Sequence, residues 1–597
     1  MKPRHNTFRP ALRTLCAAAM LCAIAAPAAS ALAAPAPVPT ASIPVFRQLD
    51  PGRVQLPDDK GVRNSGTQMS DSLDGDTARP VAPVVQDGQA VAPDAAAMPF
   101  TVEHVTLEGV TRYPADTFRP LLDTLENRPV TLAEANEVAR QVTARYRADG
   151  YLLVRTFVPA QTIDHGTLKI EVVEGRLNHV TVTGHDSAAL DRFAKNLGDE
   201  VPLTAATLER NLLLMNDLPG HAARAVLVPS EGEEGTDIVI DNENFRRVEG
   251  FAGIDNRSGR YFGPWQVYGG VGINDPLGLG DRLSVRGGTS IDGRKMNFYE
   301  GQYEVPIGSD GAALSLLAQH NDGRADVPAF LNANSQGTTV AARIAYPIIR
   351  SREQTLKVSG ALTAFDGKSV YLDDPSLPPS TNDRIRALRV GASYDFIDNQ
   401  GGRNLLKGEL SHGLDGLGAS PQDRPNASRP AGRTDFTKLQ LDAQRIQDLS
   451  AIADGLQLYL AATGQTSFGQ PLLAPEQFGV GGNFFGRGYD PSEITGDSGI
   501  AGKVELQYNR IHKVADHAVP TQYYAFWDIG KVWNSQPYYI RSASLASAGV
   551  GAHFTVAKNL FISPEIAFPL TRPVTATEIN GGNGKAPRFY LNVLKLF

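Results

Sequence analysis

The second half of the chain consists largely of short runs in which apolar and polar residues alternate. From residue 247 to Phe597 we count about sixteen such runs, each near the roughly ten residues that a tilted transmembrane strand needs. Within 386–396, one face carries Leu388, Val390, Ala392, Tyr394 and Phe396, and the other carries Arg389, Gly391, Ser393 and Asp395. A period of two is typical of strands with one apolar and one polar face. This region is therefore predicted to be all β.

Between residues 100 and 246 the pattern changes to a mixture of helix and strand periods. One helix opens with Thr131-x-x-Glu134, a capping box, and ends at Gly150. The elements expected around it are a strand at 101–110, a helix at 114–125, and strands at 151–158 and 168–173. After Glu174-Gly175 the same order starts again. Two α+β domains are therefore predicted, at 100–175 and 176–246, ahead of the strand-rich region at 247–597.

The first 33 residues have the features of an export signal. Four basic residues precede an apolar run from Leu15 to Ala26, and the small residues of Ala31-Leu32-Ala33 complete the pattern. The run is too short to span a membrane comfortably, and no later stretch offers about 18 uninterrupted apolar residues. We expect a signal peptide at 1–33, and any membrane crossing by the mature chain to use strands.

Residues 34–99 are rich in proline, alanine, glycine and aspartate and show no sustained period. Such a composition does not bury enough apolar surface to form a core, so we interpret the segment as a linker. Within it, Ile43–Leu56 alone has enough apolar residues for a short ordered element.

Composition narrows the possible functions. The formal net charge is −7, and no basic run or basic-aromatic patch indicates nucleic-acid binding. The two cysteines, Cys16 and Cys22, both lie in the expected signal peptide, so the mature chain has no thiol chemistry. The 11 histidines are scattered without a metal-ligand motif, and no complete nucleotide-binding glycine motif is present, so neither a metal nor a cofactor is expected.

One short motif could suggest an enzyme. The segment Gly496-Asp497-Ser498-Gly499 is similar to the nucleophile region of trypsin-like proteases. Ile500 stands where those proteases have glycine, and no matching histidine motif is present, although a catalytic triad needs a base and an orienting carboxylate. We interpret the segment as a turn and do not expect an enzyme.

A soluble β-sandwich or propeller would also have alternating strands. The export signal, the even number of runs, the uneven loop lengths, the missing cysteines and the aromatic Phe597 at the end together favour an outer-membrane barrel. Sixteen strands enclose a lumen too wide for side chains to fill, so it should be hydrated or plugged. The predicted fold is a transmembrane β-barrel of 16 antiparallel strands, preceded by two α+β domains.

Three groups of motifs resemble one known family in order along the chain. They are Gly150-Tyr151, Val158-Pro159-Ala160-Gln161 and Val172-Val173-Glu174-Gly175 in the first repeat, Leu213–Gly220 in the second, and Asn274–Asp281 in the strand-rich region. The family is that of the two-partner secretion transporters (TpsB), the hemolysin and filamentous-hemagglutinin secretion/activation proteins.

The resemblance implies a location and a partner. The two repeats would be periplasmic polypeptide-transport-associated (POTRA) domains, which capture an unfolded client by strand addition at their sheet edges. The barrel would be a monomer surrounded by outer-membrane lipids that exports a secreted exoprotein. The resemblance does not identify which residues of the sheet edges bind the client. Many relatives also carry an N-terminal plug helix, for which Ile43–Leu56 is the one candidate here, interrupted by Pro51-Gly52.

The most specific match lies between the expected eleventh and twelfth strands, at 481–499. Its tip, Gly486-Arg487-Gly488-Tyr489, is similar to the Val-Arg-Gly-Tyr/Phe tip of the family's sixth extracellular loop, which folds back into the lumen. Glycine stands here at position 486 where the family has valine.

The family's partner motif, Phe-x-Asp-x-Gly on the thirteenth strand, is present as Phe526, Asp528 and Gly530. Alternation places these three on one face of the strand and Trp527 on the other, so Asp528 points into the lumen if Trp527 faces lipid. An arginine fork fits a carboxylate bidentately, and we hypothesise that Arg487 pairs with Asp528 and anchors the loop inside the barrel.

Three other functions remain as alternatives. An outer-membrane protein assembly factor of the same superfamily would insert barrels rather than secrete a client, but such factors usually carry more than the two repeats that fit here. A passive diffusion porin would not need the repeats. An outer-membrane enzyme would need a catalytic constellation, and the sequence shows none.

Overall fold

The computed structural model describes residues 99–597 except 115, 176, 200–201, 231–234, 294, 328–330, 372–379, 515–516, 538 and 580. The expected signal peptide at 1–33, nearly all of the expected linker at 34–99 and the candidate plug segment Ile43–Leu56 lie outside the described residues.

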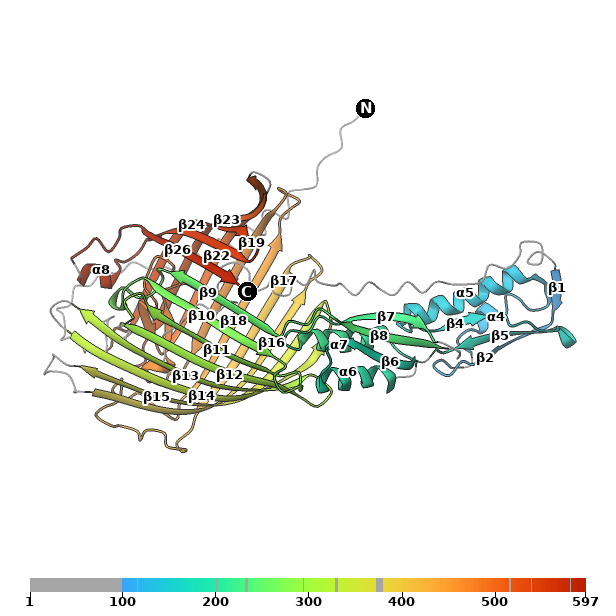
Figure 1. Cartoon of the computed structure of the whole chain (residues 1–597), viewed down its shortest axis with the longest axis horizontal. Coiled ribbons are helices and arrows are strands. Elements are labelled where there is room, and N and C mark those ends of the chain that lie inside the picture. Colours follow the sequence, from blue (N-terminus) through green and yellow to red (C-terminus); the bar gives the residue numbers. More distant parts are fainter. Residues whose placement is uncertain are drawn as a thin grey trace, which may run out of the picture. The chain divides into compact units, whose positions relative to one another are not determined.

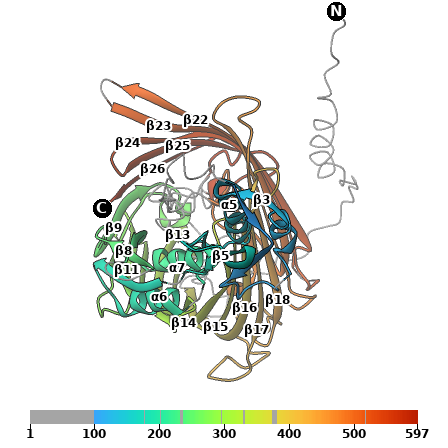
Figure 2. The same cartoon turned by 90° about the vertical axis from the view of Figure 1, so that its right-hand side faces the viewer.

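Sixteen antiparallel strands form a closed barrel, as predicted (Figure 1). Figure 2, turned by 90°, shows the strands arranged as a ring. The strands are β9 (Val248–Asp255), β10 (Gln266–Asn274), β11 (Arg282–Ser290), β12 (Met296–Ile307), β13 (Ala312–Val327), β14 (Leu331–Arg350), β15 (Gln354–Tyr371), β16 (Ser380–Ile397), β17 (Arg403–Gly413), β18 (Thr437–Asp448), β19 (Leu456–Thr466), β22 (Ser498–Val514), β23 (His517–Trp533), β24 (Ser542–Ala557), β25 (Leu560–Pro569) and β26 (Arg588–Leu596).

The ring closes between its first and last strands. Each strand pairs with the next barrel strand along the chain, and β26 returns to pair with β9, with Asn592 opposite Asp255 and Leu596 opposite Phe251. Closure leaves no barrel strand with an unpaired edge.

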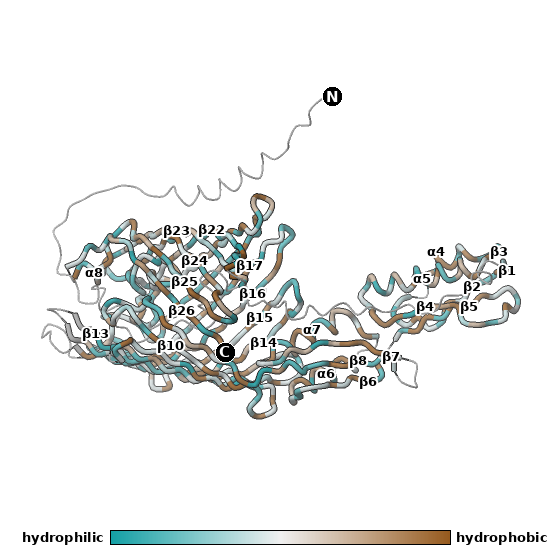
Figure 3. Tube along the Cα trace, turned by 45° about the horizontal axis from the view of Figure 1, so that its top comes forward, coloured by the Kyte–Doolittle hydropathy of each residue, from teal (hydrophilic) through white to brown (hydrophobic). Residues whose placement is uncertain are grey.

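The two faces of the barrel wall differ in polarity. On β23, Trp527 and Ile529 are each 40% exposed on the outside, whereas Phe526 and Asp528 are buried on the inside. Brown and teal segments alternate along the barrel strands in Figure 3. An apolar outer surface of this extent is stable in lipid rather than in water.

None of the helices in the described part of the chain is long and apolar enough to cross a bilayer.

Two α+β domains precede the barrel. The first contains the pair β1 (Pro99–Val102) and β3 (Arg128–Thr131), a sheet of β2 (His104–Glu108), β5 (Thr167–Val173) and β4 (Arg155–Phe157), the helices α4 (Arg119–Leu122) and α5 (Leu132–Ala148), and the short η3 (Asp164–Gly166). The second contains a sheet of β6 (Leu177–Gly184), β8 (Thr236–Asn242) and β7 (Arg224–Pro229), with α6 (Ala188–Asp199) and α7 (Ala205–Asp217). Both three-stranded sheets combine one parallel and one antiparallel pair.

Helix α5 begins where the sequence predicts. The Thr131 side chain accepts a hydrogen bond from the backbone N–H of Glu134, and the Glu134 carboxylate accepts one from the backbone N–H of Thr131. The hydrogen bonds that the Glu134 carboxylate accepts from the Thr131 N–H and from the Arg128 guanidinium lower the pKa of Glu134 to about 2. The helix buries Val142 and Tyr146 against the sheet.

The helix expected at 114–125 is wrong in length, because among the described residues of this stretch only Arg119–Leu122 is helical. Pro120 occupies the first turn, where its missing N–H is tolerated, so the helix cannot begin much earlier. The flanking residues form turns instead.

Candidate functional site

A hairpin of the long connection between β19 and β22 lies inside the barrel. The connection contains the short η5 (Ala474–Glu476) and two strands, β20 (Phe478–Val480) and β21 (Ile494–Gly496), which pair with each other. Residues 481–493 form the tip. The hairpin packs against the inward face of β22, β23 and β24, where Phe478, Val480 and Ile494 share an apolar cluster with Val532 and Leu545 of the wall.

Glycines in the wall allow the hairpin to approach closely. A Cβ atom on Gly530 would lie 2.5 Å from Cγ1 of Val480, and a Cβ atom on Gly499 would lie 2.1 Å from Cδ1 of Phe478. Both distances are too short for non-bonded carbon atoms. Packing therefore explains why glycine ends the Phe526–Gly530 segment: a side chain at Gly530 would leave no room for β20.

Arg487 at the hairpin tip is completely buried and binds Asp528 on β23. Its Nη2 lies 3.0 Å from Oδ1 of Asp528 and its Nε 3.1 Å from Oδ2. The backbone N–H groups of Gly486 and Arg487 also donate to Oδ2, at 3.1 and 3.0 Å. The guanidinium carbon stands 3.5 Å from the ring centroid of Phe526. One carboxylate thus accepts four hydrogen bonds from the tip.

Two further carboxylates surround the same guanidinium. Nη1 of Arg487 lies 2.6 Å from Glu505 on β22 and 3.7 Å from Glu565 on β25. Arg257 lies 3.2 Å from Glu565, and the buried Lys503 is the cross-strand neighbour of Asp528. Three carboxylates therefore face three cationic side chains in this buried region, so the cluster is balanced in charge.

Tyr489 fixes the other side of the tip. Its hydroxyl donates toward the carbonyl oxygens of Ala546 at 3.2 Å and Arg572 at 3.0 Å, and accepts from the backbone N–H of Arg572. The ring is buried in the apolar cluster of the hairpin. Gly488 lies beside it, close enough to the wall that a Cβ atom there would come within 2.9 Å of the Cβ of Ser547.

Gly486 adopts a backbone conformation that suits glycine. Its φ is +88°, and a Cβ atom would lie 2.8 Å from Cδ1 of Leu545. Valine at this position would be strained, because β-branched residues rarely adopt positive φ. The turn directs the N–H of Gly486 toward Asp528.

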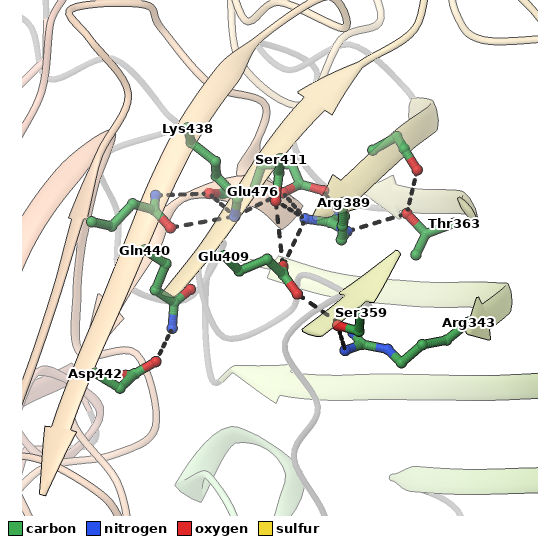
Figure 4. A network of polar contacts seen from close by, with 12 residues as sticks. Arg343, Ser359, Thr363, Arg389, Glu409, Ser411, Lys438, Gln440, Asp442 and Glu476 are labelled. Atoms are coloured by element: carbon green, nitrogen blue, oxygen red, sulfur yellow. Dashed lines mark hydrogen bonds and ion pairs between the residues drawn. The ribbon is translucent and has the colours of Figure 1, made fainter. Parts of the chain in front are cut away.

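A second anchor lies at the base of the hairpin (Figure 4). The buried carboxylate of Glu476 binds Nη2 of Arg389 on β16 at 2.7 Å and Nζ of Lys438 on β18 at 2.8 Å. Arg389 also donates to Ser411 at 2.8 Å and lies 3.8 Å from Glu409, both on β17. The hairpin is thus joined to the β16–β18 part of the wall as well as to β22–β25.

More contacts join the tip to β26 and to the connection between β25 and β26. Asp490 pairs with Arg588 on β26. Glu493 accepts hydrogen bonds from the backbone N–H of Thr575 at 2.9 Å and from its hydroxyl at 2.5 Å. Asp497, from the segment interpreted above as a turn, pairs with Arg429. The Asp497 carboxylate is thus one partner of a buried ion pair that connects two loops.

The seven residues singled out in the sequence lie together. Gly486, Arg487, Gly488 and Tyr489 form the tip, Phe526 and Asp528 face it from β23, and Gly530 on the same face of β23 adjoins Val480 of the hairpin. Sequence reasoning missed Glu476, Glu505 and Glu565. Their only sequence signal is a charged residue in or beside a strand, which does not reveal the partner.

Comparisons with known proteins agree with this architecture. Residues 234–554 match the family described as haemolysin secretion/activation protein ShlB/FhaC/HecB, and residues 100–175 match the POTRA domain of ShlB type. The heme/hemopexin transporter protein HuxB of Haemophilus influenzae (strain 86-028NP) is 22% identical over 498 residues, 81% of this chain and 84% of the relative. The outer membrane transporter CdiB of Escherichia coli O6:K15:H31 (strain 536 / UPEC) is 25% identical over 425 residues, 69% of each chain.

Solved structures show the same fold. CdiB from Escherichia coli superposes with a TM-score of 0.68 at 20% identity, covering 90% of this chain and 97% of the other. CdiB from Acinetobacter baumannii gives a TM-score of 0.59 at 14% identity, covering 94% of this chain and 100% of the other. The chain has a closed barrel with α+β domains before it, and more than half of its length matches the family. The protein therefore belongs to the haemolysin secretion/activation family, the outer-membrane transporters of two-partner secretion.

Proposed function

We propose that this chain captures an unfolded, hemolysin- or adhesin-like exoprotein in the periplasm and exports it through its barrel. The observation that carries the proposal is the hairpin in the lumen, held by the fully buried Arg487. A conduit for a polypeptide needs an interior that is blocked at rest and can be opened. A charge-balanced cluster at a single loop tip suits that task. One movement of the tip takes the guanidinium away from all of its carboxylate partners at once.

We assign residues 100–175 and 176–246 to two POTRA domains and 247–597 to the barrel. Strand addition suits the capture step, because an extended backbone can hydrogen-bond to any exposed sheet edge whatever its sequence. The outer strands of the three-stranded sheets are β2 and β4 in the first domain and β6 and β7 in the second. These edges are the proposed binding sites for the client.

A barrel assembly factor is the second candidate. Deletion of the gene distinguishes the two functions, since loss of one large protein from the culture medium, with normal amounts of other outer-membrane barrels, is expected for a transporter. A general loss of outer-membrane barrels would instead indicate an assembly factor.

The role of the tip is tested by Arg487→Ala. Removing the guanidinium breaks the buried pairs of Asp528 and Glu505 with Arg487, whereas Glu565 keeps Arg257, and a broken buried pair costs about 3–5 kcal/mol. Secretion of the client should be abolished, while the barrel stays folded as judged by its heat-modifiable migration in gels.

The matched control is Arg510→Ala on the same strand as Glu505. The Arg510 side chain is 44% exposed and pairs with Asp454 at 3.4 Å, so its contribution is at most about 1 kcal/mol. Secretion by this variant should equal that of the parent. Normal export of the client by the Arg487→Ala variant would show that the tip does not have the proposed role.

A further inference from the structure

A polar cluster that plays no part in the hairpin lies at the junction of the second POTRA domain and the barrel. It consists of His185, which follows β6, His221, which follows α7, and Asp275, which begins the turn between β10 and β11. Asp275 and His221 are buried and His185 is partly buried. Among the described residues, these three form the one group of histidine and acidic side chains whose ligand atoms converge, within 4.8 Å of one another.

Each side chain is oriented so that one ligand atom faces the others. Nδ1 of His221 lies 3.0 Å from the carbonyl oxygen of Pro219. A carbonyl oxygen only accepts, so Nδ1 carries the proton and Nε2 presents its lone pair, which faces the Ser187 hydroxyl. Oδ1 of Asp275 accepts from the N–H of Gly280 at 2.6 Å, which leaves Oδ2 to face Nε2 of His185 at 2.7 Å.

The surroundings hold these orientations. The ring of Phe245 stacks on His185 with centroids 3.7 Å apart and an interplanar angle of 12°, and meets His221 edge-on at 5.0 Å. Hydrogen bonding of the second imidazole nitrogen and an apolar wall are the features that orient histidines toward a metal. The hydroxyl of Ser187 lies 3.4 Å from Nε2 of His221.

We propose that His185, His221 and Asp275 bind one divalent transition-metal ion, with Zn²⁺ as the ion that fits best. Two imidazoles and one carboxylate are a ligand set that zinc accepts, with a fourth position left for water or the Ser187 hydroxyl. Zn²⁺ lies about 2.0–2.2 Å from such atoms, so its ligands are roughly 3.3 Å apart. The His185–Asp275 pair would open by about half an ångström, the wider separations, up to 4.8 Å, would close toward that spacing, and the ion would replace the proton that the pair shares.

The ion would join two parts that already touch. The backbone N–H of Ala188 donates to the carbonyl of Gly278 in the same turn at 2.9 Å, and Arg350 of the barrel pairs with Asp217 of α7 at 2.7 Å. Because the ligands come from three separate segments, no local spacing in the sequence reveals the site. The proposal does not depend on the identity of any exported client.

The test uses the full-length protein in detergent, purified without a polyhistidine tag and stripped of metal with a chelator. Zn²⁺ is titrated in competition with a chromophoric chelator, and Co²⁺ is added separately to record its visible absorption. We expect one tight Zn²⁺ site per chain and a Co²⁺ spectrum of a tetrahedral nitrogen–oxygen site. Zn²⁺ should also raise the midpoint of thermal unfolding, because a ligand that binds only the folded state stabilises it.

His221→Gln is the informative variant, because glutamine retains similar size and can still hydrogen-bond. It should lose the site, the Co²⁺ spectrum and the Zn²⁺-dependent rise in unfolding temperature. His179→Gln in the same domain, whose side chain is 70% exposed, should keep all three. The proposal is overturned if the wild type binds no Zn²⁺ tightly, or if His221→Gln binds it as the wild type does. Circular dichroism of His221→Gln before metal addition shows whether it is folded, and His185→Gln takes its place if it is not.

Discussion

Replacing Asp528 by asparagine should release the tip of the hairpin while leaving the size of the side chain unchanged. The two oxygens of Asp528 accept four N–H groups at 3.0–3.1 Å, two from the backbone of Gly486 and Arg487 and two from the Arg487 side chain. An asparagine amide has one accepting oxygen, and its NH₂ group would face donors. The substitution removes the charge, and even with the amide oxygen at the Oδ2 position, which accepts three of the four N–H groups, the NH₂ group opposes Nη2 of Arg487.

The magnitude follows from the burial of the pair. Breaking a fully buried ion pair costs about 3–5 kcal/mol. Arg487 retains Glu505 at 2.6 Å and Glu565 at 3.7 Å, so the lower end applies. Since about 1.4 kcal/mol corresponds to a factor of ten, the fraction of molecules with an undocked hairpin should rise roughly 100-fold.

A single cysteine reports that fraction. Thr495 on β21 is buried, and the chain has no cysteine after Cys22, so Thr495→Cys gives the barrel a single thiol. The thiol reacts with a membrane-impermeant maleimide only when the hairpin leaves the wall. When redocking is faster than labelling, the labelling rate is proportional to the undocked fraction. Asp528→Asn should therefore be labelled roughly 100-fold faster than the parent.

Asp454→Asn provides the control. Its side chain is 91% exposed and its pairing with Arg510 contributes little, so labelling should match that of the parent. The reasoning is refuted if Asp528→Asn is labelled no faster than Asp454→Asn in the same Thr495→Cys background.

Two other substitutions act on the hairpin at different points. Glu476→Gln removes the carboxylate that faces both Arg389 and Lys438, and the resulting release of the hairpin base should raise the conductance of the barrel in planar bilayers; an unchanged conductance would count against the second anchor. Gly530→Ala places a methyl group 2.5 Å from Cγ1 of Val480 and should also speed labelling of the hairpin. Adding Val480→Ala to Gly530→Ala should restore slow labelling, and failure to do so would show that the clash is not the cause.

Local rules in the sequence predict much of this structure. The alternation along β23 places Asp528 on the inside, because successive strand residues point to opposite faces. The capping box predicts the start of α5 at Thr131, because both of its hydrogen bonds lie within four residues. The same rules do not predict that Pro120 shortens the first helix, because the effect of a proline depends on its position in the helical turn.

Contacts between distant segments are not predictable in this way. Alternation marks Glu505 and Glu565 as charged residues of strands, but their shared partner Arg487 lies on a loop that reaches them only after the barrel curves round. The backbone conformation of Gly486 is likewise not predictable from the sequence, since a positive φ depends on where the tip has to direct its N–H groups. The motif resemblance indicated Arg487 and Asp528; the full set of carboxylates required the folded barrel.

The contacts of the hairpin with the end of the chain have a consequence for biogenesis. Asp490 is bound to Arg588 on β26 and Arg487 lies near Glu565 on β25, whereas the ring is sealed only when β26 reaches β9. Full docking of the hairpin therefore has to wait until β25 and β26 have joined the wall, because these strands carry the partners Glu565 and Arg588. Once docked, the hairpin braces the last strands from the inside of the cylinder, beside the seam where β26 meets β9.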